Sequence, residues 1–219
     1  MKNLNKFIVA VFAFVALAFA ATVHAQEAPD ALIKRISQDV LDIAKADREI
    51  QGGNQKRVLE LVEAKILPYV DFQRMTALAA GRYWREATPE QQKQLTAEFR
   101  DLLVYTYSGA ISQVKDQKLD FKPFRAAPTD TEVEVRSQVL QSRGDPIQLN
   151  YRLQKSPAGW KIYDINVLGA WLVETYKGNF SSEISKSGID GLIKTLADKN
   201  KRLAESATRS TAKTPKSSF

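Results

Sequence analysis

The stretch TEVEVRSQVLQSRGDPIQLNYRLQ, Thr131 to Gln154, alternates apolar and polar side chains in two runs. This alternation is typical of strands that have one face buried and the other in water. The turn-forming residues Arg143 to Pro146 separate the two runs, so we expect an antiparallel pair of strands. The apolar face carries Val133, Val135, Val139, Ile147, Leu149, Tyr151 and Leu153.

The segments on either side of this pair extend the sheet. Residues 119–125 (LDFKPFR) and residues 159–167 (GWKIYDINV) are both short and rich in aromatic and β-branched side chains. Pro123 cannot donate a ladder hydrogen bond, which favours an edge position for the first of them. The sequence therefore predicts a four-stranded antiparallel meander.

The segments before and after the predicted sheet have apolar residues at helical spacing. Upstream, it covers residues 30–51, 54–67, 71–80 and 89–113, and downstream it covers residues 168–180 and 189–203. Thr88, Pro89 and Gln91 form a capping box with proline in the first helical position, which marks one helix start sharply. We expect one α+β domain, residues 26–205, with helices packed on one face of the sheet.

The two ends of the chain differ from this body. Lys2 and Lys6 precede an apolar run, residues 7–21, and a Val-His-Ala sequence that resembles a signal-peptidase site. The run is shorter than the ~20 residues of a membrane-spanning helix, so residues 1–25 are interpreted as a secretory signal peptide rather than an anchor. Residues 206–219 are polar and basic, and we expect them to form a disordered tail.

Composition removes several classes of function. The 219-residue chain has no Cys, and its one His, His24, lies in the predicted signal peptide. The mature protein therefore lacks the side chains of Ser-His-Asp and Cys-His catalysis and the commonest zinc ligands. The net charge of +7 comes from the signal peptide and from the tail that starts with Lys199, which leaves residues 26–198 neutral. We expect no nucleic-acid binding, no metal and no cofactor.

Tyr83 and Trp84 stand between two predicted helices, next to Arg82 and Arg85. Large aromatics in this place either close a core or line a binding cavity. We interpret them as residues that hold the helix junction together. The two arginines are either solvated charges or contacts for a phosphate or an acidic partner.

Several motifs taken together resemble those of one known family. They are Pro68-Tyr69-Val70-Asp71-Phe72, the Tyr-Trp-Arg at residues 83–85 before Thr88, the strand GWKIYD at residues 159–164, and GIDGL at residues 188–192. Over residues 30–201 the chain resembles the MlaC family, also called the toluene-tolerance auxiliary family.

The resemblance implies a fold and a function. The fold is a curved sheet whose helices enclose a hydrophobic cavity, and the function is that of a periplasmic, monomeric, non-enzymatic carrier of glycerophospholipids in a Gram-negative cell. Such a carrier maintains outer-membrane lipid asymmetry. The implied partners are an inner-membrane ABC-transporter complex with its substrate-binding ring and an outer-membrane lipoprotein-porin complex.

Bulky apolar side chains on both layers are candidates for the wall of this cavity. The predicted lipid-binding residues are Val70, Met75, Leu78, Phe99, Leu103, Tyr107, Val135, Val139, Leu149, Tyr151, Val167 and Leu172, with Tyr105 and Tyr176 nearer the mouth. Periodicity does not distinguish a filled interior from a hollow one, so a filled core is the competing interpretation of the same residues.

Two other functions fit parts of the pattern. An isomerase-like enzyme would also have helices and a curved sheet around an apolar pocket, and Tyr163 and Asp164 would be its reactive pair. A chaperone for unfolded outer-membrane proteins would need long exposed hydrophobic arms, whereas this chain has short, compact elements.

Overall fold

The computed structural model describes residues 26–212, so the predicted signal peptide and the last seven residues of the chain lie outside the described part. The helices are α2 (Pro29–Ala46), α3 (Arg48–Gln51), α4 (Gln55–Lys65), α5 (Phe72–Ala80), α6 (Tyr83–Glu86), α7 (Pro89–Tyr107) and α8 (Leu172–Ala212), with 3-10 helices η1 (Leu67–Tyr69) and η2 (Ser108–Gln113). The strands are β1 (Lys118–Phe121), β2 (Glu132–Leu140), β3 (Ile147–Ser156), β4 (Gly159–Val167) and β5 (Ala170–Trp171).

Polar side chains cap the N-termini of several short helices. Asp47, Asn54 and Asp71 accept backbone N–H groups at the starts of α3, α4 and α5. The capping box predicted at Thr88 is present, with both reciprocal hydrogen bonds to Gln91. The helix that follows is shorter than predicted, because α7 ends at Tyr107 and the chain continues to Gln113 as η2.

The predicted meander is confirmed, and a fifth short strand extends it. The strand order is β1-β2-β3-β4-β5 with antiparallel neighbours throughout. β5 has only two residues and pairs with the end of β4, which is too short for an alternation pattern to indicate. A register shift opposite Arg152 and Leu153 leaves Tyr163 without a partner in the ladder. The edge of β4 that pairs with β5 also pairs with Val70, which forms a parallel bridge with Ile162.

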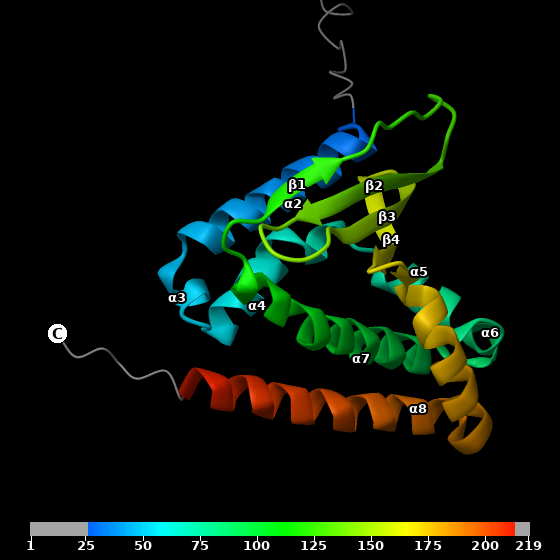
Figure 1. Cartoon of the computed structure of the whole chain (residues 1–219). Helices are drawn as coiled ribbons and strands as arrows, with labels where there is room; N and C mark the ends of the chain where they lie inside the picture. The colour runs from blue at the N-terminus through cyan, green and yellow to red at the C-terminus, as the bar shows by residue number, and fades with distance from the viewer. Residues whose placement is uncertain (1–25, 213–219) are drawn as a thin grey trace, which may run out of the picture.

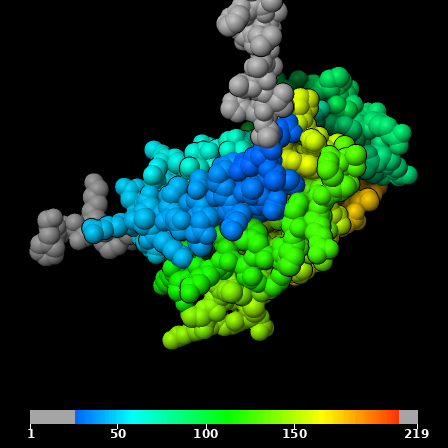
Figure 2. Space-filling model, turned by 90° about the horizontal axis from the view of Figure 1, so that it is seen from above, coloured from blue at the N-terminus to red at the C-terminus, as the bar shows by residue number. Residues whose placement is uncertain are grey.

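The helices lie on one side of the sheet (Figure 1). α2 packs against β1 and β2 and lies beside them in the view from above (Figure 2). α7 and the second half of α8 run side by side in the same direction, and Gln91–Asp190 and Glu98–Asn200 hydrogen bonds join them. The fold class predicted from sequence, α+β with helices on a curved antiparallel sheet, is confirmed.

Helix α8 bends at Gly188, where φ is 74° and ψ is −179°. This conformation is essentially restricted to glycine, so the helix changes direction there and its second half follows α7 (Figure 1). The helix continues to Ala212, which differs from the disordered tail expected from residue 206 onward. No helix of residues 26–212 is both long and apolar enough to cross a membrane.

Candidate functional site

The apolar interior is divided into separate clusters. The helical cluster joins α5, α7 and α8, and the sheet cluster joins α2 to β2, β3 and β4. Of the described residues, Val70 and Ile165 are the ones packed against both clusters, and both are only half-buried. Most domains have one contiguous core, whereas this interior is divided. We call the boundary between the helical cluster and the sheet cluster the seam.

The predicted lipid-binding residues fall on both sides of the seam. In the helical cluster, Met75, Phe99, Leu103 and Leu172 are buried, and Val167 and Tyr176 pack against them half-buried. In the sheet cluster, Val135 and Tyr151 are buried and Leu149 is half-buried. Val70 contacts both. The structure thus assigns nine of the predicted residues to one cluster or the other and Val70 to both.

The apolar face of the sheet is covered unevenly. The middle of this face, defined here as Val135, Tyr151, Leu153 and Ile162, is buried. The far end of the same face, defined as Val139, Ile147, Leu149 and Val167, is half-buried along its whole width. Large exposed apolar side chains, Leu140 and Leu168, follow directly at this end. The far end is therefore where the apolar face is most accessible.

Three of the predicted residues are on helices and belong to neither cluster. Leu78 is 39% exposed and Tyr107 is 36% exposed, while Tyr105 is half-buried between α4 and α7. Tyr107 nevertheless lies close to Tyr176. Burial, and after it the nearby Tyr107 hydroxyl, raises the pKa of Tyr176 to about 12. Of the two residues predicted nearer the mouth, Tyr176 packs half-buried against the helical cluster and Tyr105 lies between α4 and α7, whereas Leu78 faces solvent.

Tyr163 and Asp164, the reactive pair of the enzyme interpretation, have different partners. The Tyr163 hydroxyl donates to Glu132 at 3.0 Å, and Arg74 stacks on the Tyr163 ring at 4.0 Å from its centroid. Asp164 instead accepts the N–H groups of Ile165 and Val173. Neither residue lines the pocket between α4 and α7, and their side chains contact different groups, so the structure gives no support to a shared catalytic site.

Asp164 has a structural task at the start of α8. Its side chain is 2% exposed, and the N–H that it accepts at 3.0 Å from Val173 is one of the free donors of the first helical turn. Burial raises the pKa of the Asp164 carboxyl, although these two backbone hydrogen bonds and Arg152 at 3.5 Å oppose the effect. Arg152 also stacks on Trp171 at 3.8 Å. Together, Asp164, Arg152 and Trp171 fix the start of α8 to strand β4.

Tyr83 and Trp84 belong to the helix junction, as predicted. Both pack half-buried against the helical cluster. The Tyr83 hydroxyl contacts Ser185 of α8 at 3.1 Å, and the Trp84 carbonyl accepts from Gln92 of α7 at 2.8 Å. Arg82 donates to the Tyr83 hydroxyl and stacks on the Tyr83 ring, so this exposed arginine contacts the junction.

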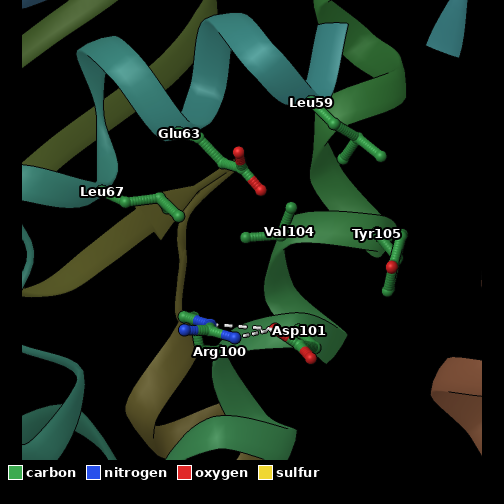
Figure 3. Close-up of a pocket in the computed structure, with 7 residues that line it drawn as sticks. All are labelled: Leu59, Glu63, Leu67, Arg100, Asp101, Val104 and Tyr105. Carbon is green, nitrogen blue, oxygen red and sulfur yellow. Dashed lines mark hydrogen bonds and ion pairs between the residues drawn. The ribbon is translucent and has the colours of Figure 1, made fainter. Parts of the chain in front are cut away.

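A pocket of about 210 Å³ opens between α4 and α7. Leu59, Leu67, Val104 and Tyr105 give it apolar walls, and Glu63, Arg100 and Asp101 give it charge. Figure 3 shows Glu63 of α4 and Arg100 of α7 extending toward the same space from opposite helices. Arg100 pairs with Asp101 at 2.8 Å.

The sequence indicated only one of these seven residues, Tyr105. The pocket joins two helices that are separated by more than twenty residues, and their relative rotation is set by tertiary packing. Glu63 and Arg100 each occupy an ordinary exposed helix position in the sequence. Within residues 26–212, no group of three His, Cys, Asp or Glu side chains could hold a metal ion.

Comparison with known proteins gives consistent results. Residues 34–198 match the family model described as MlaC protein. A Haemophilus influenzae protein named intermembrane phospholipid transport system binding protein MlaC is 23% identical over 190 residues, covering 85% of this chain and 89% of that protein. The Pseudomonas putida toluene tolerance protein ttg2D is 23% identical over 203 residues, covering 90% and 94%.

A solved structure is similar over most of the fold. It is a phospholipid-binding protein from Ralstonia solanacearum in complex with a phospholipid, with 48% sequence identity and a TM-score of 0.77. The similarity covers 81% of this chain and 99% of that one.

Proposed function

The chain belongs to the MlaC family, and from this premise we propose that it is a soluble periplasmic carrier of glycerophospholipids. It takes the acyl chains into its apolar interior and moves lipid between the outer and inner membranes, which maintains outer-membrane asymmetry. The relative named for phospholipid transport and the similar chain solved with a phospholipid support this function. The predicted signal peptide, residues 1–25, supports export.

The seam carries the proposal. The two clusters share only Val70 and Ile165 among the described residues, so a space between them can open while most contacts inside each cluster and the Asp164 link from β4 to α8 are kept. Acyl chains placed between them contact the half-buried far end of the sheet on one side and Leu103, Tyr107 and Tyr176 on the other. The pocket between α4 and α7, about 210 Å³, is smaller than the ~300–1,000 Å³ typical of sites that enclose a whole ligand. We therefore place the acyl chains in the seam, which has to widen to admit them.

The energetics favour carriage over release to water. Two acyl chains hold about 30 buried carbons, and at ~0.8 kcal/mol per methylene the gross transfer free energy exceeds ~20 kcal/mol. This value is near the ceiling of non-covalent affinity. Release thus requires a partner that offers a continuous apolar path. We propose the inner-membrane ABC-transporter complex with its ring and the outer-membrane lipoprotein-porin complex in this role. No catalytic step is needed.

Native mass spectrometry of the purified mature protein, with lipid extraction from the same sample, tests the function. We expect a stoichiometric glycerophospholipid adduct. A bare mass that persists after incubation with phospholipid vesicles would contradict the proposal and favour a filled core.

Transfer is tested separately with donor and acceptor vesicles that carry a fluorescent phospholipid. The carrier should raise the rate of transfer in proportion to its concentration. A protein that binds lipid but leaves this rate unchanged would be a lipid-binding protein without a shuttle function.

A further inference from the structure

We propose that the turns beyond the far end of the sheet dock on the surface of an anionic lipid bilayer. This docking surface, which we call the tip, comprises residues 115–118, 140–146 and 168–170. The antiparallel register brings these three segments to the same end of the sheet. The inference goes beyond the proposed function, because a protein can carry lipid without touching a bilayer and can touch a bilayer without carrying lipid.

Leu168 is the residue that points to an external contact. It is 72% exposed, and it is also the one non-glycine residue between 26 and 212 with a positive φ, 53°. Together with Gly169, whose φ is 89°, it forms the turn between β4 and β5. Turns with positive φ at both central positions favour Asn or Gly in the first of them. A leucine here is unfavourable both for the backbone and for its hydration, and such outliers are found where a protein makes functional contacts.

The fold holds this leucine in place. The Leu168 N–H donates to the Gln148 carbonyl at 3.0 Å, and the Gly169 N–H donates to the side chain of Asn166 at 3.1 Å. Leu140, 37% exposed at the end of β2, is the second exposed leucine of the tip. The β2–β3 turn that follows it projects from the body in the view from above (Figure 2). Both leucines are thus presented on turns that are already ordered, which lowers the entropic cost of docking.

Cations lie next to the two leucines. Lys118 pairs with Leu140 at the edge of the sheet, and Arg143 is in the turn after β2. Lys115 comes just before β1. All three are exposed, and their side chains make no hydrogen bond or ion pair with any residue between 26 and 212. These charges are therefore free to meet the phosphates of a membrane.

The tip also carries carboxylates, Asp116 and Asp145. Lys45 of α2 adds another cation beside them, because its ammonium donates to the Gln117 carbonyl at 2.7 Å. Cations thus outnumber carboxylates at this end, although residues 26–198 as a whole are neutral. Each Lys or Arg near an anionic membrane surface favours binding by about fivefold. The attraction expected here is modest and depends on salt.

A bilayer fits the tip better than a protein does. Protein interfaces are centred on Trp, Tyr and Arg side chains that fill pockets, whereas the tip has no aromatic residue. Trp171, which follows it, is already stacked on Arg152. Separate leucines flanked by Lys and Arg suit a layer in which apolar side chains enter the acyl boundary and cations stay among the headgroups. Docking in this way places the half-buried far end of the sheet next to the bilayer.

Flotation with vesicles tests the contact on the whole mature protein. The vesicles contain equal parts phosphatidylglycerol and phosphatidylcholine, or phosphatidylcholine alone, and the fraction of protein that floats is measured. We expect binding to the anionic vesicles at low ionic strength, about tenfold weaker binding to phosphatidylcholine alone, and release by salt. Equal binding to both kinds of vesicle would overturn the electrostatic part of the proposal.

Leu168→Asn separates docking from folding. Asn is favoured at this turn position, so the melting temperature should stay the same or rise. Binding to the anionic vesicles should nevertheless fall about fivefold, because no leucine enters the bilayer. A lower melting temperature with unchanged binding would give Leu168 a structural role and overturn its role in docking.

The charges are tested by two double variants. Lys118→Gln with Arg143→Gln should lower binding to the anionic vesicles about tenfold. Lys93→Gln with Lys186→Gln is the matched control, because it removes two exposed cations from α7 and α8 and should leave binding unchanged. Equal losses in both variants would show that net charge alone matters and would overturn the tip as the contact surface.

A fluorescent label locates the contact. The chain has no Cys, so an environment-sensitive fluorophore can be attached to Leu168→Cys alone. Its emission should shift to the blue with anionic vesicles, whereas the same label on Ser182→Cys, exposed on α8, should not respond. A shift that requires membrane proteins in the vesicles would assign the tip to a protein partner and overturn the bilayer assignment.

The phospholipid content of the same samples distinguishes this inference from the proposed function. A protein that contains phospholipid but neither floats nor shows the fluorescence shift would overturn the docking surface and leave the carrier intact. A protein that floats through the tip but never contains phospholipid would support the docking surface and contradict the carrier.

Discussion

The middle and the far end of the sheet belong to the same strands and the same apolar face, yet their environments differ. Leu153 in the middle is 0% exposed beneath α2, whereas Leu149, four residues earlier on β3, is half-buried. The alternation that places both side chains on this face is identical. One sheet can therefore provide a stable core at one place and an accessible apolar surface at another.

The strongest test of this comparison is a pair of matched truncations on β3. Leu153→Ala should lower the free energy of unfolding by about 2–5 kcal/mol, because it leaves a cavity in a filled core. Leu149→Ala should cost about 1 kcal/mol, since less apolar area is lost from a half-buried site. Urea unfolding measures both. Equal losses would show that the far end is packed as firmly as the middle.

Asp164 lies on β4 between the middle and the far end, and it holds the start of α8. Asp164→Ala leaves the N–H groups of Ile165 and Val173 without their acceptor and should cost about 1–3 kcal/mol. Asp164→Asn keeps an acceptor oxygen and should cost less. Hydrogen exchange at the Val173 amide is the direct measurement. Unchanged protection of this amide in the alanine variant would contradict the capping role.

A charge at the far end should affect lipid more than fold. Val139→Lys places an ammonium where acyl chains are proposed to lie, so retained phospholipid should fall about tenfold, or ~1.4 kcal/mol. Gln138→Lys is the control, because Gln138 is on the opposite face of the same strand and bonds Asp120. Lipid phosphate per mole of protein gives the result. A folded Val139→Lys protein with full lipid content would remove Val139 from the binding surface.

Asp164 is buried and Asp120 is partly exposed. Their contributions to stability should change with pH in opposite directions. Burial raises the pKa of Asp164, so its contribution to stability is complete below the unfolded value of about 3.9 and is lost as the pH rises through the folded value. The hydrogen bond from Lys122, and then one from Gln138, lowers the pKa of Asp120. Its contribution is present above the unfolded value and is lost as the pH falls through the folded one.

Unfolding of Asp164→Asn and Asp120→Asn between pH 3 and pH 7 checks these signs. Relative to the wild type, Asp164→Asn should gain stability as the pH rises, and Asp120→Asn should lose it. Parallel curves for the wild type and Asp164→Asn would mean that this carboxyl has the same pKa folded and unfolded.

The sequence predicted those features of the fold that depend on neighbours in the chain. The capping box at Thr88 needs residues only three positions apart, and the strands from Glu132 to Ser156 follow a period of two. The two-residue strand β5 and the change from α7 to η2 at Ser108 have no such local pattern. β5 pairs with the adjacent end of β4 but is too short to show an alternation, and η2 packs against the distant helix α4.

The candidate site was less predictable for a related reason. Periodicity identified Val139, Leu149 and Val167 as inward-facing, and their register confirms that they share a face. It could not show that they are half-buried while Val135 is buried, because that depends on how the helices cover each part of the face. Glu63 and Arg100 were missed because only the tertiary arrangement of α4 and α7 brings them to one pocket.

The position of α8 in the chain has a consequence for biosynthesis. Leu172, Val173, Phe180, Ile184, Leu192 and Leu196 supply nearly half of the buried members of the helical cluster, and all come from the last element of the chain. A chain made from its N-terminus therefore keeps the apolar surfaces of α5 and α7 uncovered until synthesis is almost complete. Contacts such as Glu98 with Asn200, 102 residues apart, close late. The helical cluster of the growing chain is therefore completed only after α8 has been made, whereas the sheet cluster contains no residue of α8.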